Sequence, residues 1–405
     1  MSTTVSDRLN RIQPSPTSAI SDRARQLRAM GQDVISLSQG EPDFGTPDHI
    51  KTAAEIAIRD GHTRYTEVDG IPELKEAVSQ KFRRENDLEY SSSQITVTSG
   101  CKQLLFNAFM ATLNTNDEVI IPAPYWVSYS AMVEIADGNP IIVQCLAKNN
   151  FKLAPGQLEE AITSATRWLI LNSPSNPTGA VYTQEELTAL AEVLLRHPHV
   201  MIITDDIYEH LIYGDVSFFT LAQVEPRLKD KILTCNGMSK AYCMTGWRIG
   251  FAGGPESLIR PMAKLQSQSN FHPASISQHA AIAGLDGGLG FLQPQLQAYR
   301  ERRDALVLEL NRIDGLVCSI PDGAFYVFPS CSGLYGRLTP DGRTLNTDTD
   351  VVEYFLDVAG VALVPGQAFG TPGYFRVSYA ADINIVMSAC ERIQFACEKL
   401  IEKAS

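Results

Sequence analysis

The sequence lacks the features of a membrane or secreted protein. No apolar run approaches the length of a membrane span, and residues 1–13 contain no apolar segment of the kind a secretory signal needs. The eight cysteines are scattered and include no C-x-x-C pair, which favours a compartment where thiols stay reduced. We therefore expect a cytoplasmic protein.

Positive charge is also scarce. The chain has 34 Lys and Arg against 46 Asp and Glu, and its formal net charge of −12 argues against nucleic acid or an anionic membrane as the main partner. His197 and His199 flank a proline where a turn is expected, so we interpret them as surface residues and predict no metal site. With 405 residues, of which 44% are hydrophobic, the chain can form one large domain and a smaller one.

Apolar runs of strand length alternate with segments of helical periodicity. The expected strands are 95–98, 118–121, 167–171, 200–204 and 232–235. The expected helices are 19–30, 49–60, 72–84, 103–113, 185–196, 293–311 and 382–403. We interpret the glycine-rich run 284–290 as a connector. This alternation predicts an α/β protein with a parallel sheet, whose ligands collect at the carboxyl ends of the strands.

Lys240 is the first candidate for chemistry. It lies just after the apolar run 232–235, in the pattern S-K-x(4)-T-G-x-R-x-G, which ends with Arg248 and Gly250. A lysine in a pocket poor in water loses its charge easily and attacks aldehydes. An arginine nearby offers a fork for a phosphate or a carboxylate. Pyridoxal phosphate carries both an aldehyde and a phosphate.

Other polar candidates share this position after a strand. They are residues 100–102, 126, 176 and 205–208. Gly100 lies between a strand and a helix, so the helix N-terminus can direct backbone N–H groups at an anion. We expect these residues to meet at one edge of the sheet.

The chain resembles the class I pyridoxal-phosphate aminotransferases, and most closely the bacterial aspartate aminotransferases. The resemblance rests on the motifs N-S-P-x-N-P-T-G, D-D-I-Y and S-K-x(4)-T-G-W-R-I-G, in that order. It implies a fold type I α/β homodimer with active sites at the subunit interface. The implied division is an N-terminal arm with part of the small domain (1–47), a large cofactor-binding domain (48–295) and a small C-terminal domain (296–405).

The resemblance assigns roles around the cofactor ring. Lys240 matches the lysine that forms a Schiff base with the cofactor and later moves the α-proton of the substrate. Asp205 matches the carboxylate that keeps the pyridine nitrogen protonated, which makes the ring a better electron sink. Tyr208 and Asn176 match the two groups that hydrogen-bond the phenolate oxygen, and Trp126 matches the aromatic residue that stacks on the ring.

Further roles concern the phosphate. Gly100, Cys101 and Lys102 match the backbone cradle, and Arg248 matches the phosphate clamp. Tyr65 matches a tyrosine that reaches the phosphate in the neighbouring subunit.

The substrate site is implied in the same way. Arg376 matches the arginine that binds the α-carboxylate, and Gly40 offers a backbone contact nearby. Trp126 and Asn176 also border the substrate. In the bacterial branch, a lysine at the position of Lys102 helps to read the distal carboxylate.

The chain departs from this family at the mouth of the substrate site. Relatives carry glycine in place of Cys101, lysine in place of Gln13 and small hydroxyl residues around 271–273. The loop after Tyr65 is acidic here, with Glu67 and Asp69. We expect an acidic mouth to disfavour a dicarboxylate, and Phe271 to favour an aromatic side chain.

The sequence thus predicts an aminotransferase that moves the amino group of an L-amino acid, aspartate, to a 2-oxo acid, 2-oxoglutarate, in two steps. One alternative keeps the chemistry with an aromatic or other amino acid or with prephenate. Another is a β-lyase on the same fold. A third is a catalytically silent regulator with the same fold.

Overall fold

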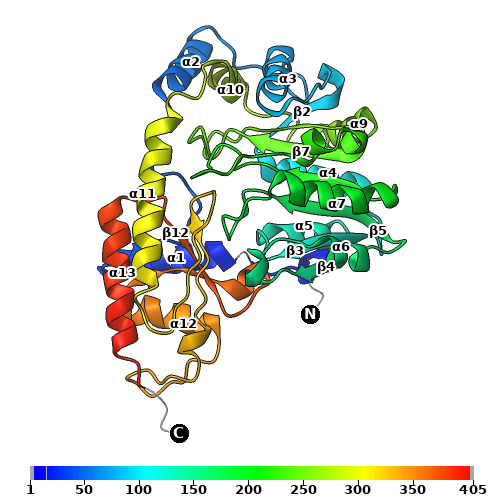
Figure 1. Ribbon diagram of the computed structural model, residues 1–405. Coiled ribbons are helices and arrows are strands. Elements are labelled where there is room, and N and C mark those ends of the chain that lie inside the picture. The colour runs from blue at the N-terminus through cyan, green and yellow to red at the C-terminus, as the bar shows by residue number, and fades with distance from the viewer. Residues whose placement is uncertain (1–3, 15, 402–405) are drawn as a thin grey trace.

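A seven-stranded sheet lies at the centre of the computed structural model, which describes residues 4–14 and 16–401 (Figure 1). The strand order is β2-β8-β7-β6-β5-β3-β4. The strands are β2 (Ile95–Thr98), β3 (Glu118–Ala123), β4 (Asn139–Gln144), β5 (Thr166–Asn172), β6 (Met201–Asp205), β7 (Ile232–Gly237) and β8 (Gly250–Gly253). Only β8 runs antiparallel to its neighbours in this sheet. The predicted α/β architecture with a mainly parallel sheet is confirmed.

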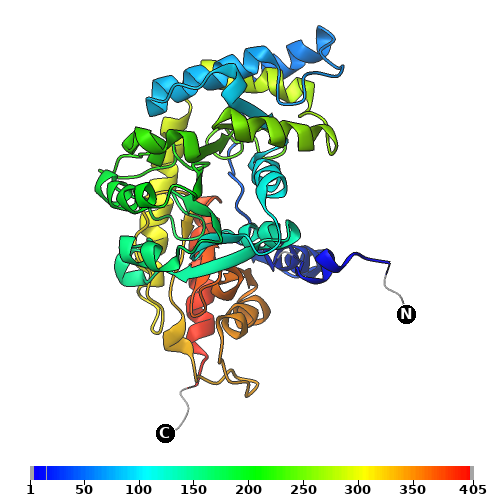
Figure 2. The same cartoon turned by 90° about the vertical axis from the view of Figure 1, so that its right-hand side faces the viewer.

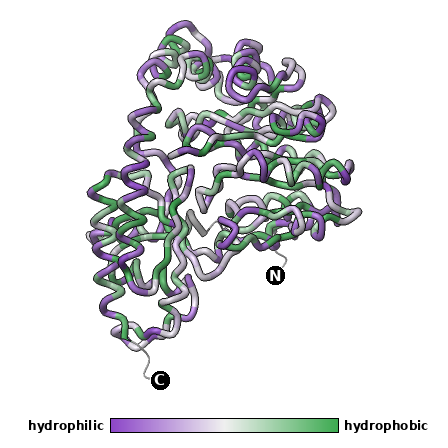
Figure 3. Tube along the Cα trace, in the orientation of Figure 1, coloured by the Kyte–Doolittle hydropathy of each residue, from purple (hydrophilic) through white to green (hydrophobic). Residues whose placement is uncertain are grey.

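Both faces of this sheet are buried, because successive side chains along a strand point to opposite sides. Ile120, Leu169 and Ile202 belong to the core on one face, whereas Ile121 and Ile170 belong to the core on the other. The strands are accordingly hydrophobic along much of their length, while helices such as α11 (Leu292–Leu310) alternate between hydrophobic and hydrophilic residues (Figure 3).

Helices cover the sheet on both sides and at one end. They are α2 (Asp48–Arg59), α3 (Pro72–Asn86), α4 (Cys101–Thr112), α5 (Ser128–Ile135), α6 (Pro155–Ala161), α7 (Gln184–Arg196), α8 (Leu221–Val224), α9 (Glu256–Ser267) and α10 (Ser275–Asp286). The buried residues of α2, Ile50, Ala54 and Ala57, recur at helical spacing. They face α10, which also packs against α3 (Figure 1). Across residues 4–14 and 16–401, no helix has both the length and the apolar content that a membrane crossing requires.

The remaining elements come from both ends of the chain. Strand β1 (Ile35–Ser36) pairs in parallel with β10 (Val361–Ala362). A three-stranded antiparallel sheet contains β11 (Val364–Pro365), β12 (Phe375–Ser378) and β9 (Tyr326–Val327). Their helices are α1 (Pro16–Ala29), α11, α12 (Asp348–Tyr354) and α13 (Ile383–Glu398). Helix α1 and the N-terminal residues project from one side of the molecule (Figure 2). The domain boundaries at 47 and 295 stay predictions.

Several elements differ in extent from the prediction. Helix α1 begins at Pro16, before the expected residue 19, and α13 ends at Glu398. The glycine-rich run 284–290 is not wholly a connector, because α10 continues to Asp286. A β-carbon on Gly284 would lie 2.6 Å from Met238 Cε, so this glycine serves close packing within a helix.

We predict that Gly250→Ala destabilises the protein. A β-carbon at Gly250 would lie 2.4 Å from the backbone nitrogen of Cys101, and backbone atoms cannot move aside as a flexible side chain can. We expect a loss of about 1–3 kcal/mol in the free energy of unfolding, measured by urea denaturation. Gly246→Ala is the matched control, because a β-carbon there meets no described atom within 4 Å. Equal stability of the two variants would contradict this account of the strand-helix junction.

Candidate active site

The carboxyl edge of the sheet carries the predicted site residues. Asp205 is the last residue of β6, and Lys240 follows three residues after the end of β7. Arg248 reaches the same edge for a different reason: β8 is antiparallel, so the residues that precede it lie where the parallel strands end. The register places Gly250 opposite both Gly237 and Thr98. One edge therefore collects residues that lie far apart in the sequence.

These residues surround a cavity of about 490 Å³. The predicted site residues that line it are Gly40, Cys101, Lys102, Trp126, Asn176, Asp205, Tyr208, Lys240, Arg248 and Arg376. Gly100 adjoins the lining, but Tyr65 lies outside the cavity of its own chain and is 88% exposed. The cavity therefore joins the sheet edge to Arg376 in β12 and Gly40 near the N-terminus.

Lys240 is poised to be a neutral amine. Its Nζ donates a hydrogen bond to the carbonyl oxygen of Gly40 at 2.6 Å and lies 5.7 Å from the ring centre of Tyr208. Burial, and then the positive charge of Arg376, lower the pKa of Lys240 to about 8. About a tenth of the amine is thus unprotonated at pH 7, far more than for an ordinary lysine, and able to act as a nucleophile or a base.

Asp205 is a buried carboxylate, only 4% exposed. The hydroxyl of Tyr129 donates to Asp205 Oδ2 at 2.6 Å, and the thiol of Cys101 lies 3.7 Å from Oδ1. Burial raises the pKa of the Asp205 carboxyl, and the hydrogen bonds from Tyr129 and Cys101 oppose that rise. Such a group is suited to pair with a cationic nitrogen that enters the cavity.

An anion cradle adjoins these groups at the N-terminus of α4. Gly100 precedes the helix with φ +87°, in the left-handed region that favours glycine. A β-carbon there would lie 2.3 Å from Arg248 Nη2, so the absence of a side chain lets the guanidinium approach the helix. The N–H groups of a first helical turn lack intrahelical partners and attract anions such as phosphate.

Arg376 forms the opposite wall and is 3% exposed. Its Nη1 donates to Asn176 Oδ1 at 2.8 Å and its Nη2 to the carbonyl oxygen of Ser38 at 2.5 Å. Its buried Nε has no hydrogen-bond partner among the described residues. A buried guanidinium with an unsatisfied donor is suited to a carboxylate ligand.

Lys102 supplies a second cation at the cavity. Its Nζ lies 4.9 Å from the centre of the Trp126 ring. Burial, and then the neighbouring Arg248, lower the pKa of Lys102. Asp22 and Arg25 of α1 line the cavity as well, and the two side chains form an ion pair at 3.2 Å.

The residues expected at the mouth of the substrate site do not line the cavity of their own chain. Phe271 packs edge-on against Tyr65, with ring centres 5.5 Å apart, and does not line the cavity. Asp69 forms an ion pair with Lys75 at 2.7 Å, and neither it nor Glu67 lines the cavity. These residues cluster with one another because their two loops are adjacent on the surface. They cannot set the substrate preference of their own chain's cavity by direct contact.

Sequence reasoning missed other cavity residues. Tyr129 holds Asp205, and Tyr326 holds Tyr208 through a hydroxyl contact of 2.8 Å. Tyr129 lies one helical turn beyond Trp126. Only its short distance from the end of a strand could have indicated that it belongs to the cavity. Tyr326 belongs to the short strand β9, and its pattern gave no sign that it faces the site.

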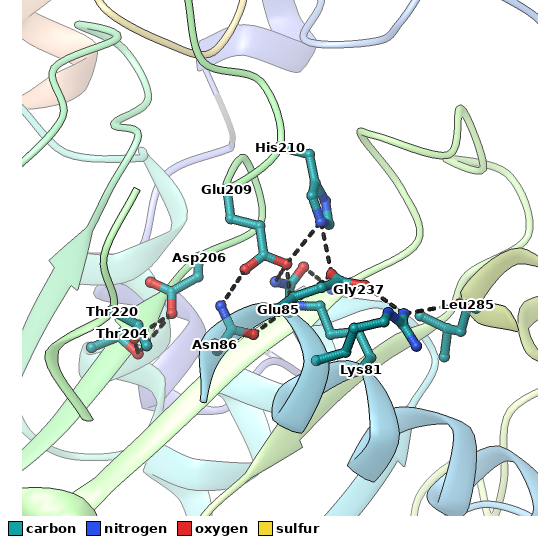
Figure 4. A network of polar contacts seen from close by, with 12 residues as sticks. Lys81, Glu85, Asn86, Thr204, Asp206, Glu209, His210, Thr220, Gly237 and Leu285 are labelled. Carbon is teal, nitrogen blue, oxygen red and sulfur yellow. Dashed lines mark hydrogen bonds and ion pairs between the residues drawn. The ribbon is translucent and has the colours of Figure 1, made fainter. Parts of the chain in front are cut away.

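A buried ion-pair network lies behind Tyr208. Lys81 of α3, whose side chain is 1% exposed, pairs with Glu209, and its Nζ also lies 3.6 Å from Glu85 Oε2 (Figure 4). Glu85, Glu209 and His210 hold ligand atoms within 4.8 Å of one another. Because the ammonium of Lys81 already balances these carboxylates, we interpret the cluster as a structural network.

Glu209 ties three elements together in this network. Its Oε2 accepts from Asn86 of α3 at 2.9 Å, and its Oε1 accepts from Asn236 of β7 at 2.7 Å. Glu209 directly follows Tyr208, and Asn236 precedes Lys240 by four residues. The network therefore fixes the backbone that carries both site residues.

A half-buried lysine, a buried carboxylate and an anion cradle around one cavity define an enzyme site for amine and aldehyde chemistry. The model of the family described as aminotransferase class I and II matches residues 32–393. The chain belongs to this family and is an aminotransferase, as its motifs predicted.

Individual relatives match almost the whole chain. The aspartate/prephenate aminotransferase of Cereibacter sphaeroides is 54% identical, over 98% of this chain and 99% of its own. The crystal structure of the aspartate aminotransferase from Rhizobium meliloti superposes with a TM-score of 0.96 at 51% identity, covering 98% of this chain and 100% of its own. The structure of the Thermus thermophilus aspartate aminotransferase with maleate superposes with a TM-score of 0.91 at 41% identity, covering 97% of this chain and 100% of its own. The fold is thus that of the aspartate aminotransferases.

We predict that Glu209→Gln strongly destabilises the protein. The substitution leaves the buried ammonium of Lys81 without its nearest counter-charge. We expect a loss of about 3 kcal/mol or more in the free energy of unfolding, measured by urea denaturation. The double variant Lys81→Met/Glu209→Gln removes both charges and should recover most of the loss. A double variant less stable than Glu209→Gln would contradict the interpretation.

Proposed function

We propose that this aminotransferase uses pyridoxal phosphate to transfer the amino group of L-aspartate to 2-oxoglutarate in two half-reactions. The observation that carries the proposal is one cavity that contains Lys240, Asp205 and Arg376. The three groups offer an amine for an aldehyde, a carboxylate for a cationic ring nitrogen and a guanidinium for an α-carboxylate. Any two of these three groups without the third would fit other reactions of amines equally well.

The residues present fit the cofactor. The space left open by Gly100, the N-terminus of α4 and the guanidinium of Arg248 suit a phosphate dianion. Asp205 is buried, and the two side chains that donate hydrogen bonds to it are an uncharged hydroxyl and an uncharged thiol, so its carboxylate suits a protonated ring nitrogen. Tyr208 and Asn176 would hydrogen-bond the ring oxygen, and the indole of Trp126 would lie against the ring. We propose that the backbones of Cys101 and Lys102 also form part of the phosphate cradle.

Each residue then has a chemical task. The cofactor supplies an aldehyde that holds the amino group and a ring that stores electrons. Lys240 would hold the cofactor through its amine, and its Nζ would move a proton to and from the α-carbon of the substrate. Asp205 keeps a proton on the ring nitrogen through its negative charge. Arg376 orients the substrate by its α-carboxylate, with the backbone of Gly40 alongside.

Lys102 supports a dicarboxylate substrate. Its ammonium lies next to the Trp126 ring at the cavity, and a point charge on a flexible stem accommodates carboxylates at different distances. The names of the relatives from Rhizobium meliloti and Thermus thermophilus include aspartate, and the latter structure contains maleate, a dicarboxylate. Aspartate, glutamate and their 2-oxo acids fit two cations.

Prephenate is the second candidate substrate. The name of the Cereibacter sphaeroides relative includes both aspartate and prephenate. Prephenate also carries two carboxylates, so Arg376 and Lys102 would serve it as well. Gln13, where relatives carry lysine, is exposed and does not line the cavity.

We also propose a cytoplasmic homodimer. Tyr65 is 88% exposed and lies outside its own cavity, which is expected of a residue that completes the phosphate site of a second subunit. The eight cysteines are free thiols, consistent with a reducing compartment.

The experiment that tests the proposed function is a panel of initial rates. Aspartate, glutamate, phenylalanine and the amino product of prephenate are each offered with 2-oxoglutarate. Aspartate should give the highest kcat/KM. A protein that binds pyridoxal phosphate but transfers no amino group from any of them would refute the proposal.

We predict that Lys240 reacts with pyridoxal phosphate with a pH midpoint near its lowered pKa of about 8. Only the neutral amine attacks an aldehyde, so the rate in cofactor-free protein should rise about tenfold per pH unit below 8 and level off above it. Stopped-flow absorbance measures the rate, and borohydride reduction with peptide mapping locates the attachment.

Lys240→Ala is the control and should abolish this phase. Attachment to another lysine, or a midpoint above pH 10 as for an ordinary lysine, would contradict the assignment.

We predict that Arg376 and Lys102 affect different substrates. Arg376→Ala should lower kcat/KM for every donor, by about tenfold to a hundredfold or more, because all donors carry an α-carboxylate. Lys102→Ala should lower kcat/KM about tenfold or more for aspartate and leave phenylalanine nearly unchanged. Steady-state kinetics with both donors measures this. Equal losses on the two donors with Lys102→Ala, or no loss on either, would remove Lys102 from substrate recognition.

A further inference from the structure

Tyr326 occupies the junction between the two walls of the cavity. It is 1% exposed, and its hydroxyl oxygen lies 2.8 Å from that of Tyr208. The guanidinium carbon of Arg376 lies 4.5 Å from the centre of its ring. One side chain thus touches both the residue proposed for the cofactor ring and the residue proposed for the substrate carboxylate.

The sheet around Tyr326 explains this position. Strand β9 pairs with β12, with Tyr326 opposite Ser378 and Val327 opposite Val377, so Tyr326 and Arg376 project from adjacent strands. On its other side the hydroxyl lies under Gly40, where a β-carbon would be only 2.1 Å from the Tyr326 oxygen. The carbonyl of Gly40 in turn accepts the hydrogen bond from Lys240. The phenol is therefore closely surrounded.

The pair of hydroxyls has a directional consequence. Burial is the main cause that raises the pKa of both phenols, so both keep their protons. Within the pair one hydroxyl donates and the other accepts. When Tyr326 donates, the proton of Tyr208 is free to point into the cavity, where a ligand oxygen can accept it.

The ring of Tyr326 has a separate task. A cation over an aromatic face is attracted by the ring's quadrupole, more strongly where water is excluded. Arg376 also has a second ring near it, that of Phe369 at 5.0 Å. Two aromatic faces and the hydrogen bonds to Asn176 and Ser38 fix the plane of the guanidinium.

We propose that Tyr326 is a positioning residue that couples the two walls: its hydroxyl directs the proton of Tyr208 toward the bound cofactor, and its ring orients Arg376 for the substrate carboxylate. The inference rests on the proposed function and adds to it a residue outside the sequence motifs. A purely structural Tyr326 would affect stability alone.

Two substitutions separate the two tasks. Tyr326→Phe removes the hydroxyl and keeps the ring, whereas Tyr326→Leu removes both. Tyr213→Phe is the matched control. It also removes a buried hydroxyl near β9, one that donates to the carbonyl of Ala324, and Tyr213 does not line the cavity. Thermal unfolding of each variant reports structural loss separately.

The first readout is the pH midpoint of the absorbance change of bound pyridoxal phosphate, without substrate. An oxygen that loses a donated hydrogen bond holds its proton more tightly, so Tyr208→Phe should move the midpoint to higher pH. Tyr326→Phe should move it in the same direction by a smaller amount. The double variant should move it no further than Tyr208→Phe alone, because Tyr326 acts through Tyr208.

The second readout is the dissociation constant of maleate, measured by calorimetry on protein without cofactor. Tyr326→Phe should leave it within about twofold of the wild type, and Tyr326→Leu should weaken binding by about threefold to tenfold, as expected for loss of a cation–ring contact. Tyr213→Phe should change neither readout.

The outcomes are distinguishable. A wild-type midpoint in Tyr326→Phe, or midpoint shifts that add in the double variant, overturns the role of the hydroxyl. Wild-type affinity for maleate in Tyr326→Leu overturns the role of the ring. If Tyr326→Leu does not fold, Tyr326→Phe still decides the first question, and Tyr326→Met, which also lacks the ring, replaces it for the second. Wild-type protein that binds no pyridoxal phosphate overturns the proposed function and the hydroxyl role together.

Discussion

The burial of charge is the constraint on which the active site depends. Asp205 and Arg376 are 4% and 3% exposed, and an ion without water costs several kcal/mol unless neighbours replace its hydration. The protein supplies those neighbours one by one: Tyr129 for the carboxylate, and Asn176 with the Ser38 carbonyl for the guanidinium. The cavity is therefore lined with polar groups that satisfy one another, and the Nε of Arg376 is the buried donor of its described lining that keeps no partner.

The same principle operates one layer behind the cavity. Lys81 and Glu209 are buried with each other, and the side-chain amides of Asn86 and Asn236 each donate a hydrogen bond to the Glu209 carboxylate. This network joins α3 to the segments that follow β6 and precede Lys240. Polar groups in the interior thus fix the backbone positions from which the cavity's own side chains project.

Residues adjacent to strand ends could be predicted from the sequence, because parallel strands bring their carboxyl ends to one edge. Lys240 and Asp205 are of this kind, and the match to the family model confirms the enzyme class. Tyr326 could not be found, since its partner Tyr208 is 118 residues away and β9 has only two residues. Phe271 does not line the cavity of its own chain, because it packs against Tyr65 where two surface loops meet, and a loop contact of this kind leaves no pattern in the sequence.

The pairing of β1 with β10 has a consequence for synthesis. Ile35 leaves the ribosome long before its partner Val361, so the two-stranded sheet cannot form during most of translation. The seven-stranded sheet contains no strand beyond Gly253 and can assemble earlier. Until the last segments emerge, Gly40 lacks Arg376 across the cavity and residues 35–40 lack a fixed place. We expect the nascent chain to leave Ile35 and Leu37 exposed until then, so the order of synthesis delays completion of the cavity.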